Sequence, residues 1–470
     1  MVSRRLDGAN VQATGPFETF RDFVLAMEAN GQLLRIPEMD QDRYEASAFA
    51  YRLVDEFGVM GAPAFLSERM KIDGEWKTEP VVANLYGSWV SEALCFGLDS
   101  IPSKPREVYR ATFDKVMQMT DEGEWRRIKA VIKEKTDALC KEVVVTGDDI
   151  DVRKFPWMKV NPADGGRYIN SGAVIIEDPV LGRNVGTYRC MIKNKKRITI
   201  NSEVGQHGWN LLMSAKRRGE RAVKCAVVVG ADPITWSMSC SKIAGLGEDE
   251  YELAGGLLGR PLDVVKCETS EILVPANAEM IIEGEIPLYE TEEDGPHGEM
   301  YGYLGQKRTD DFFMDIDAIT HRQQPWIFNN HTGVLRGFCT IPSDVHNFLH
   351  YKKIVPYLTA IHTISDNVGV VAASIQKRFA GDGLAAGHNI LGRNFVTKVV
   401  IVVDDDIDVL DRDAVINAIA ARWQPLHATA IVPFAPAPLL EPSTPSPRIT
   451  SKVVIDATRQ LPSEGGPKEF

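Results

Sequence analysis

The stretch Val396–Val403 is a nearly continuous run of apolar residues. A strand with apolar residues on both faces must be covered by further layers of structure on both sides. The acidic segment Asp404–Asp408 marks the end of this strand. Asp411 is then placed to cap a helix whose apolar residues recur on one face from Val415 to Trp423. This part of the chain therefore predicts a layered α/β structure.

The first part of the chain has a similar α/β character. Apolar residues at helical spacing predict a helix over Phe20–Met27, ended by Asn30-Gly31, and Leu33–Ile36 predicts a short strand. The charged stretch Glu124–Cys140 is typical of another helix. We therefore expect an N-terminal α/β domain over residues 1–154.

From about Phe155 onward, short strands predominate, with helices inserted between them. This pattern predicts a β-rich middle domain over residues 155–325 and a C-terminal α/β domain over residues 326–470. Pro433–Pro447 is proline-rich and predicts an extended surface arm. The predicted middle-domain strands are Tyr168–Ile176, Asn184–Lys193, Arg197–Ile200, Ala222–Gly230, Met280–Ile286 and Phe312–Thr320, and the inserted helices lie around Trp209 and over Glu250–Leu258.

Composition excludes several classes of function. The 470 residues carry a net charge of −12, which argues against nucleic-acid or anionic-membrane partners because either would require basic patches. No stretch approaches the roughly 20 apolar residues that span a bilayer, and the N-terminus lacks the apolar core of a secretory signal. The seven cysteines occur singly, which predicts reduced thiols and a cytoplasmic location.

Common catalytic motifs are absent. The chain has no phosphate-binding G-x-x-x-x-G-K-[ST] loop and no G-x-G-x-x-G that follows a strand. It also lacks H-E-x-x-H and G-x-S-x-G. Any chemistry must therefore come from residues that are dispersed along the chain.

One dispersed group offers ligands that a hard divalent ion prefers. Asn184 lies on a predicted strand, Gln206-His207 lies between a strand and a helix, and Glu248 stands near the start of a helix. An amide oxygen, an imidazole and a carboxylate suit Mn²⁺ or Mg²⁺, particularly when a phosphate completes the shell. Taken singly, each residue also fits an ordinary cap, turn or exposed helix start.

A second group combines Arg189 with two acids, Asp294 and Glu299, which flank a Gly-Pro-His-Gly turn. A guanidinium near two carboxylates holds at least one of them ionised and fixes its orientation. The other acid could keep a proton and donate it, as proton transfer to carbon requires. A purely structural ion pair is the alternative explanation of the same residues.

In order and spacing these residues resemble the UbiD family of decarboxylases. The resemblance extends over most of the chain and is densest between Asn184 and Gly305. The matching phrases are N-x-x-x-x-R at Asn184–Arg189, Q-H at Gln206–His207, the helix start at Glu248–Gly259, V-V-K-C-E-T at Val264–Thr269, acid-G-P-x-G-acid at Asp294–Glu299, and T-K-V-V-I-V-V-D-D-D-I-D at Thr397–Asp408.

The resemblance implies a fold, a cofactor and residue roles. The middle domain would be a split-barrel-like domain that binds prenylated FMN, and the C-terminal domain would mediate oligomerisation. Asn184, His207 and Glu248 would hold Mn²⁺ (or Mg²⁺) beside the cofactor phosphate, and Gln206 and Arg189 would also contact the cofactor. Lys398 would contact that phosphate, and K⁺ would bind close to it.

The same resemblance implies a reaction, namely reversible non-oxidative decarboxylation through a covalent adduct with prenylated FMN. Arg189 would orient the substrate carboxylate, Asp294 would complete the triad, and Glu299, with a raised pKa, would protonate the carbon that loses CO₂. Two positions depart from the common pattern. Asp294 stands where glutamate is commoner, and His297 stands where an apolar aromatic residue is frequent.

The substrate would be an aromatic, heteroaromatic or α,β-unsaturated carboxylic acid, with a fused heteroaromatic ring of phenazine type as one candidate. A flavin prenyltransferase would supply the cofactor, and the chain would form a homodimer or a trimer of dimers. The residues expected to line the substrate pocket are His297, His331, Leu335 and Phe338, with Ile169 and Met238.

Two other functions are compatible with the same residues. A metal-dependent hydrolase would use Asn184, His207 and Glu248 to activate water and would contain no flavin. A non-catalytic flavin-binding subunit would bind the cofactor without turnover, although the retained Arg189 and its acids argue against it.

Overall fold

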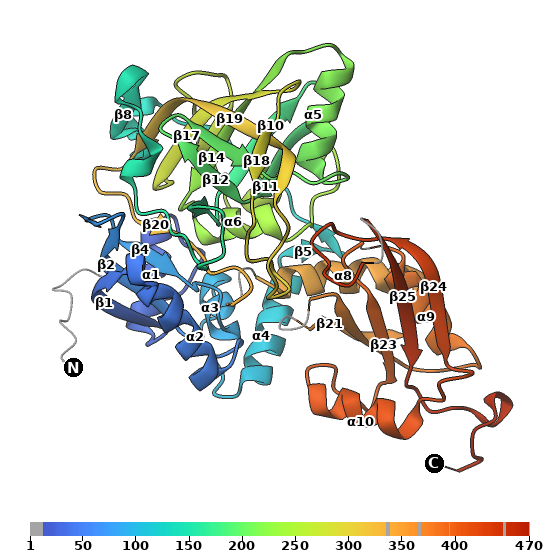
Figure 1. Ribbon diagram of the computed structural model, residues 1–470. Coiled ribbons are helices and arrows are strands. Elements are labelled where there is room, and N and C mark those ends of the chain that lie inside the picture. Colours follow the sequence, from blue (N-terminus) through green and yellow to red (C-terminus); the bar gives the residue numbers. More distant parts are fainter. Residues whose placement is uncertain (1–12, 335–338, 365–367, 394, 445–447, 470) are drawn as a thin grey trace. The chain divides into compact units, whose positions relative to one another are not determined.

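The computed structural model describes residues 13–334, 339–364, 368–393, 395–444 and 448–469 (Figure 1). The chain forms two compact units. The first comprises Met1–Gly298 and Leu304–Cys339, and the second comprises Glu299–Tyr303 and Thr340–Phe470.

The N-terminal part of the first unit is α/β, as predicted. The Thr19 hydroxyl caps helix α1 by accepting from the Asp22 N–H at 3.1 Å, and Asn30 with Gly31 ends the helix. Strands β1 and β2 pair in parallel, and β4 continues the sheet to β20. The elements are α1 (Phe20–Ala29), β1 (Leu33–Asp40), α2 (Glu45–Phe57), β2 (Ala64–Ile72), β3 (Glu75–Lys77), β4 (Val81–Ala83), α3 (Trp89–Cys95), α4 (Pro105–Met117) and β20 (Ile327–Phe328).

The larger part of this unit is built on a ten-stranded sheet in the order β11-β10-β14-β17-β19-β13-β12-β9, with β18 and β8 also paired to β19. The pairings among the described strands form an open path rather than a closed barrel. The strands are β8 (Val143–Thr146), β9 (Tyr168–Ile169), β10 (Ala173–Asp178), β11 (Gly182–Thr187), β12 (Cys190–Asn194), β13 (Arg197–Ile200), β14 (Ala222–Val229), β17 (Met280–Pro287), β18 (Glu292–Asp294) and β19 (Arg308–His321).

Two long strands that the sequence predicts are each divided. Tyr168–Ile176 separates into β9 and β10, and Asn184–Lys193 separates into β11 and β12 with a break at Tyr188-Arg189. Both breaks redirect side chains that an unbroken strand would place by strict alternation. The second break turns the Arg189 side chain toward Asp294.

The predicted helix at Glu124–Cys140 is wrong. This segment instead contains β6 and β7 and two short 3₁₀ turns. The Ile128 N–H donates to Glu252 O at 3.0 Å and the Val131 N–H donates to Leu262 O at 2.9 Å, so partners from a distant part of the chain hold it extended. A Cβ atom at Gly256 would come within 1.9 Å of Arg126 O, so the glycine permits this close approach.

The predicted helices around Trp209 and over Glu250–Leu258 are confirmed as α5 and α7. With α6 they pack next to β11, so three helices surround the strand that carries Asn184. The remaining elements of the unit are β5 (Thr120–Asp121), β6 (Glu124–Trp125), β7 (Val131–Ile132), α5 (His207–Arg217), α6 (Pro233–Cys240), α7 (Glu250–Leu258), β15 (Asp263–Lys266) and β16 (Leu273–Pro275).

The second unit has three layers and confirms the strand buried on both faces. Along β23, Val400 and Val402 belong to a core that includes residues of α8 and α9, whereas Ile401 and Val403 belong to a core that includes residues of α10. The sheet order is β21-β22-β23-β25-β24. The elements are α8 (Ile341–Ile354), β21 (Leu358–Thr363), β22 (Val370–Ile375), α9 (Asp382–Leu391), β23 (Val399–Asp404), α10 (Arg412–Arg422), β24 (Thr429–Pro436) and β25 (Ile449–Asp456).

The predicted extended arm at Pro433–Pro447 is wrong for its first residues. Thr429–Pro436 forms the edge strand β24, which pairs antiparallel with β25. Proline is tolerated at such an edge because its missing N–H faces away from the sheet.

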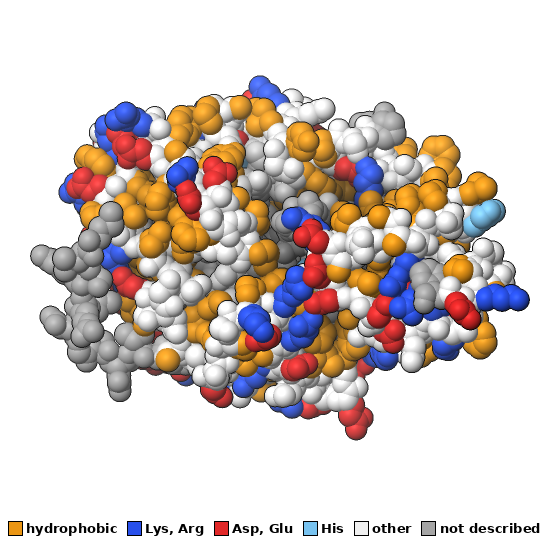
Figure 2. Space-filling view, turned by 90° about the horizontal axis from the view of Figure 1, so that it is seen from below, with side chains coloured by type: hydrophobic (Ala, Val, Ile, Leu, Met, Phe, Trp, Pro, Cys, Tyr) orange, Lys and Arg blue, Asp and Glu red, His pale blue; other side chains and the backbone are white. Residues whose placement is uncertain are grey.

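The surface charges and the state of the cysteines agree with what the composition predicts. On the face shown in Figure 2, Lys and Arg side chains are interspersed with Asp and Glu. All seven cysteines are free thiols. None of the helices in the described part of the chain combines the length and apolar character needed to cross a bilayer.

A buried ion pair in the first unit allows a stability test. Lys141 Nζ lies 2.9 Å from Glu283 Oε1, and both side chains are buried. Replacing Lys141 with Met leaves the Glu283 carboxylate buried without its cation, so we expect the free energy of unfolding to fall by about 3–5 kcal/mol. Urea denaturation at pH 7 measures this change.

The control is the double variant Lys141→Met/Glu283→Gln, which removes both charges and should regain much of the lost stability. Lys104→Met breaks an exposed pair with Glu107 and should change the free energy of unfolding by less than about 1 kcal/mol. An equal fall in the free energy of unfolding for Lys141→Met and Lys104→Met would contradict the prediction that the buried pair contributes more than the exposed one.

Candidate active site

Arg189 and Asp294 form a buried ion pair. The break between β11 and β12 turns Arg189 toward the end of β18, where its Nε and Nη2 donate to Asp294 Oδ2 at 3.0 and 2.8 Å. The Thr199 hydroxyl donates to Asp294 Oδ1 at 2.9 Å, and Asp294 has no exposed surface. The shorter aspartate therefore reaches the arginine at this position.

The turn after Asp294 is held by neighbouring side chains. Gly295 has a φ of +83°, which favours glycine. Its N–H donates to Tyr168 Oη at 3.1 Å, and the Gly298 N–H donates to Asp164 Oδ1 at 2.8 Å. A Cβ atom at Gly298 would come within 2.3 Å of Asn161 Nδ2. These contacts explain why the segment is neither a helix nor a regular strand.

Glu299 begins the next turn. Its N–H donates to Tyr303 O at 2.9 Å, and its carbonyl accepts from the Gly302 N–H at the same distance. Glu299 is part of the second compact unit. Its contact with Arg189 stays a prediction.

Sequence reasoning missed a further buried carboxyl group near this pair. Asp311 on β19 accepts from Arg308 Nη2 at 2.7 Å and from Asn201 Nδ2 at 3.1 Å. Burial raises the pKa of Asp311 to about 6, against the effect of Arg308, and the charge of Asp294 contributes to the same direction. Neither spacing nor a motif marks Asp311, because strand pairing alone brings it here.

Tyr188 contacts one predicted metal ligand and the backbone of the residue that follows another. Its hydroxyl oxygen accepts from Asn184 Nδ2 at 3.3 Å and from the Gly208 N–H at 3.1 Å. Gly208 follows His207, the first residue of α5. Burial and the charge of Lys242 lower the pKa of His207, which keeps its imidazole neutral and able to bind a metal.

Glu248 and Glu250 both lie near this group, because the charge of Glu248 acts on the pKa of His207 and the charge of Glu250 acts on that of Tyr188. Glu248 is 42% exposed at its side chain, where it pairs with Arg127 at 2.6 Å and accepts from the Gly245 N–H. Glu250 lies in the first turn of α7, is 5% exposed and accepts from the Val185 N–H. Its Oε2 has no hydrogen-bond partner in the described part of the chain, and burial raises its pKa to about 8.

A buried carboxylate oxygen without a partner fits a divalent cation, because the cation would supply the missing charge. Among the described residues, no cluster of three or more His, Cys, Asp and Glu side chains is placed to bind a metal. A metal here would therefore depend on the amide of Asn184 together with one imidazole and one carboxylate. The signal for Glu250 was its place on the buried face of α7, two residues beyond the exposed acid.

The other two predicted cofactor contacts are engaged within the chain. Gln206 Oε1 accepts from the Glu203 N–H at 2.9 Å. Lys398 lies in the second unit, where its ammonium group pairs with Glu441 and donates to Ser443 Oγ at 2.6 Å.

Two of the predicted substrate residues are buried histidines. His297 and His331 are 2% and 0% exposed, and neither ring has a hydrogen-bond partner among the described residues. Burial lowers the pKa of His297 to about 3, with a contribution from Arg189, and lowers that of His331 to about 4. Leu335 and Phe338 lie outside the described residues, whereas Ile169 and Met238 are buried.

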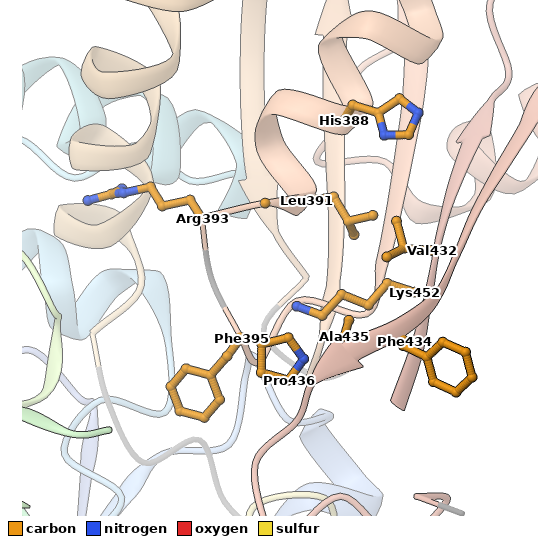
Figure 3. Close-up of a pocket in the computed structure, with 10 residues that line it drawn as sticks. His388, Leu391, Arg393, Phe395, Val432, Phe434, Ala435, Pro436 and Lys452 are labelled. Atoms are coloured by element: carbon orange, nitrogen blue, oxygen red, sulfur yellow. The ribbon is translucent and has the colours of Figure 1, made fainter. Parts of the chain in front are cut away.

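A separate pocket of about 440 Å³ lies in the second unit (Figure 3). Lys452 extends into it between Leu391 and Ala435, whereas Arg393 points away and donates to Asn347 Oδ1 of α8 at 3.0 Å. Among the described residues, none of the predicted site residues lines this pocket. The lining is His388, Leu391, Gly392, Arg393, Phe395, Val432, Phe434, Ala435, Pro436 and Lys452.

These layered units and the buried polar site are those of an α/β enzyme, and comparison with known proteins identifies the family. Three models of 3-octaprenyl-4-hydroxybenzoate carboxy-lyase domains match consecutive segments. They are the N-terminal domain at residues 24–110, the Rift-related domain at 131–335 and the C-terminal domain at 344–457.

Known relatives match nearly the whole chain. A phenolic acid decarboxylase of Sedimentibacter hydroxybenzoicus is 29% identical over 96% of this chain and 94% of its own length. The structure of vanillic acid decarboxylase from the same organism, in its closed form, has a TM-score of 0.83 at 27% identity and covers 97% of this chain and 95% of that chain. The UbiD-class enzyme HmfF from Pelotomaculum thermopropionicum, an evolved dimeric form in complex with prFMN, has a TM-score of 0.78 at 26% identity, covering 95% of this chain and 96% of that chain.

The chain therefore belongs to the UbiD family. It is a carboxy-lyase of the UbiD type.

Paired substitutions can show which of the two acids, Glu248 or Glu250, binds a metal. Glu250→Gln should weaken Mn²⁺ binding by more than about tenfold, because even partners outside the coordination shell change metal affinity 10–100-fold. Glu248→Gln should leave Mn²⁺ binding within about twofold. Titration with Mn²⁺, followed by metal analysis of the desalted protein, measures both. The reverse order of the two variants would restore Glu248 as the ligand.

His331 predicts a dependence of stability on pH. Its folded pKa of about 4 lies below the ordinary value near 6.5, so on acidification the unfolded chain binds a proton first. Between pH 7 and pH 5 this residue should lower the free energy of unfolding by about 2 kcal/mol. Urea denaturation at both pH values should show that His331→Phe lacks this component. An identical pH dependence in the two proteins would contradict the prediction.

Proposed function

We propose that this chain reversibly decarboxylates an aromatic, heteroaromatic or α,β-unsaturated carboxylic acid with prenylated FMN as cofactor. The observation that carries the proposal is the buried Arg189–Asp294 pair, which lies directly before the turn that leads to Glu299. Family membership and the prFMN complex of HmfF support the choice of cofactor.

Prenylated FMN, when bound, supplies the electrophilic centre that accepts electrons as CO₂ leaves. The chain would orient the acid and move the proton. Arg189 would hold the substrate carboxylate, and Asp294 fixes the guanidinium plane from a position that Thr199 fixes in turn. A positioned arginine lowers the entropic cost of reaching the reactive geometry.

Glu299 would deliver the proton to the carbon that has lost CO₂. A general acid must keep its proton near neutral pH until the reaction requires it, so a raised pKa is part of this role. The short distance along the chain between Asp294 and Glu299, through a turn held by Tyr168 and Asp164, supports a common place of action.

Asn184, His207 and Glu250 would hold Mn²⁺ or Mg²⁺ beside the cofactor phosphate, with Glu250 in place of Glu248. Lys398 would exchange its contact with Glu441 for that phosphate, and K⁺ would bind close by. Their donor types suit hard cations and anions respectively.

The acid would lie against His297 and His331, with Leu335 and Phe338 completing the pocket. A flavin prenyltransferase would supply the cofactor, and the C-terminal region would form a homodimer or a trimer of dimers. The dimeric form of HmfF supports self-association.

The first test is the absorption spectrum and intact cofactor mass of protein produced together with a flavin prenyltransferase. Bound prenylated FMN and release of CO₂ from at least one acid in a panel would support the proposal. A colourless protein without a flavin mass would overturn it and favour a metal-dependent hydrolase.

Glu299→Gln tests the proton donor. The amide keeps the shape of the side chain but has no acidic proton, so turnover should fall by about 100-fold or more while the cofactor stays bound. Rates of CO₂ release and the cofactor absorbance, measured on the same preparation, separate these effects.

Glu293→Gln is the matched control. Glu293 precedes Asp294 and pairs with Lys307 at 2.7 Å, so its replacement should leave turnover within about twofold. Loss of cofactor from Glu299→Gln, or undiminished turnover, would remove Glu299 from the role of proton donor.

A further inference from the structure

His297 has a buried polar side chain. It lies in the turn between Asp294 and Glu299 and is 2% exposed. Its imidazole ring lies 4.4 Å from the Tyr168 ring, centroid to centroid, at an angle of 44°. Neither Nδ1 nor Nε2 has a hydrogen-bond partner among the described residues.

The nearest carboxylate does not satisfy this ring. Asp164 Oδ1 lies 4.0 Å from His297 Nδ1, beyond hydrogen-bond distance. Both oxygens of Asp164 already accept backbone N–H groups, from Gly298 at 2.8 Å and Asn161 at 2.9 Å. Asp164 therefore accepts hydrogen bonds from the loop backbone rather than from the imidazole.

The backbone that carries the ring is held in place. The His297 carbonyl accepts from the Gly305 N–H at 2.7 Å, and the Pro296 carbonyl accepts from the Gly165 N–H at 2.7 Å. The turn is therefore fixed at His297 and at the residue before it. A phenylalanine would keep the contact with Tyr168 and avoid burying two polar atoms, so a histidine is favourable here when a bound molecule pairs with its nitrogens.

The charge state of the ring limits which chemical groups can pair with it. Burial lowers the pKa of His297 to about 3, and the charge of Arg189 acts in the same direction. At neutral pH the imidazole therefore has one nitrogen that donates and one that accepts. A neutral imidazole pairs with a hydroxyl or a ring N–H, whereas a second carboxylate would require a cation.

We propose that His297 is a specificity-determining residue that hydrogen-bonds an uncharged hydroxyl or ring N–H of the substrate. The substrate class then narrows to hydroxyaromatic acids and heteroaromatic acids with a ring N–H. The inference rests on the proposed decarboxylase function and deepens it, because the same turn carries Asp294 and leads to Glu299.

The experiment uses matched pairs of acids on the holoenzyme. The pairs are 4-hydroxybenzoate with benzoate, 3,4-dihydroxybenzoate with 3-hydroxybenzoate, 4-hydroxycinnamate with cinnamate, and pyrrole-2-carboxylate with furan-2-carboxylate. Within each pair only one hydroxyl or ring N–H differs. CO₂ release gives kcat/KM for each acid.

We expect the hydrogen-bonding member of at least one pair to be preferred by about tenfold or more. His297→Phe should reduce that preference to about twofold or less by slowing the preferred acid, with the other member nearly unchanged. His297→Gln, which keeps a donor and an acceptor, should retain more of the preference than His297→Phe. His427→Phe, at an exposed histidine, is the matched control and should retain all of it.

The outcomes separate this inference from the function beneath it. Release of CO₂ from none of the acids by the wild-type holoenzyme would overturn the proposed function and the inference with it. Preference for the member without the hydroxyl or N–H in every pair that reacts would overturn the inference alone. Equal slowing of both members by His297→Phe would also overturn it, and circular dichroism and cofactor content of that variant establish that it is folded.

Discussion

The buried ion pair of Arg189 and Asp294 is the interaction on which the site depends. Charged groups withdrawn from water are stable only when they are hydrogen-bonded, and here two N–H groups of Arg189 and the Thr199 hydroxyl donate to a single carboxylate. This requirement explains the break between β11 and β12, which turns Arg189 inward. It also explains the fixed turn after Asp294, since a mobile loop could not hold the carboxylate in place.

Two buried polar groups lack such partners. Among the described residues, one oxygen of the Glu250 carboxylate and both nitrogens of the His297 ring have no hydrogen-bond partner. Buried polar groups are normally paired. These are therefore the groups for which we propose a metal ion and a substrate group as partners.

Much of the fold could be predicted because local patterns and tertiary packing agree. Alternating and helical periodicity located α1, α5, α7 and most strands of the large sheet. The failure at Glu124–Cys140 arises because helical spacing competes there with hydrogen bonds to Glu252 and Leu262, which are distant in sequence. The edge strand within Pro433–Pro447 was missed for a similar reason, because its pairing with β25 is not visible in its own proline-rich sequence.

The sequence by itself determined the layered α/β architecture, and it selected Arg189, Asp294, Asn184 and His207, because periodicity and the order of polar residues are properties of the chain. Only the tertiary structure distinguished the surroundings of Glu248 from those of Glu250. The two acids are two residues apart at the start of a helix. Glu248 is exposed and pairs with Arg127, whereas Glu250 is buried beside Val185. Tertiary structure likewise added Asp311 and left the His297 ring without a hydrogen-bond partner among the described residues, because burial and the supply of partners depend on segments that meet only in the folded chain.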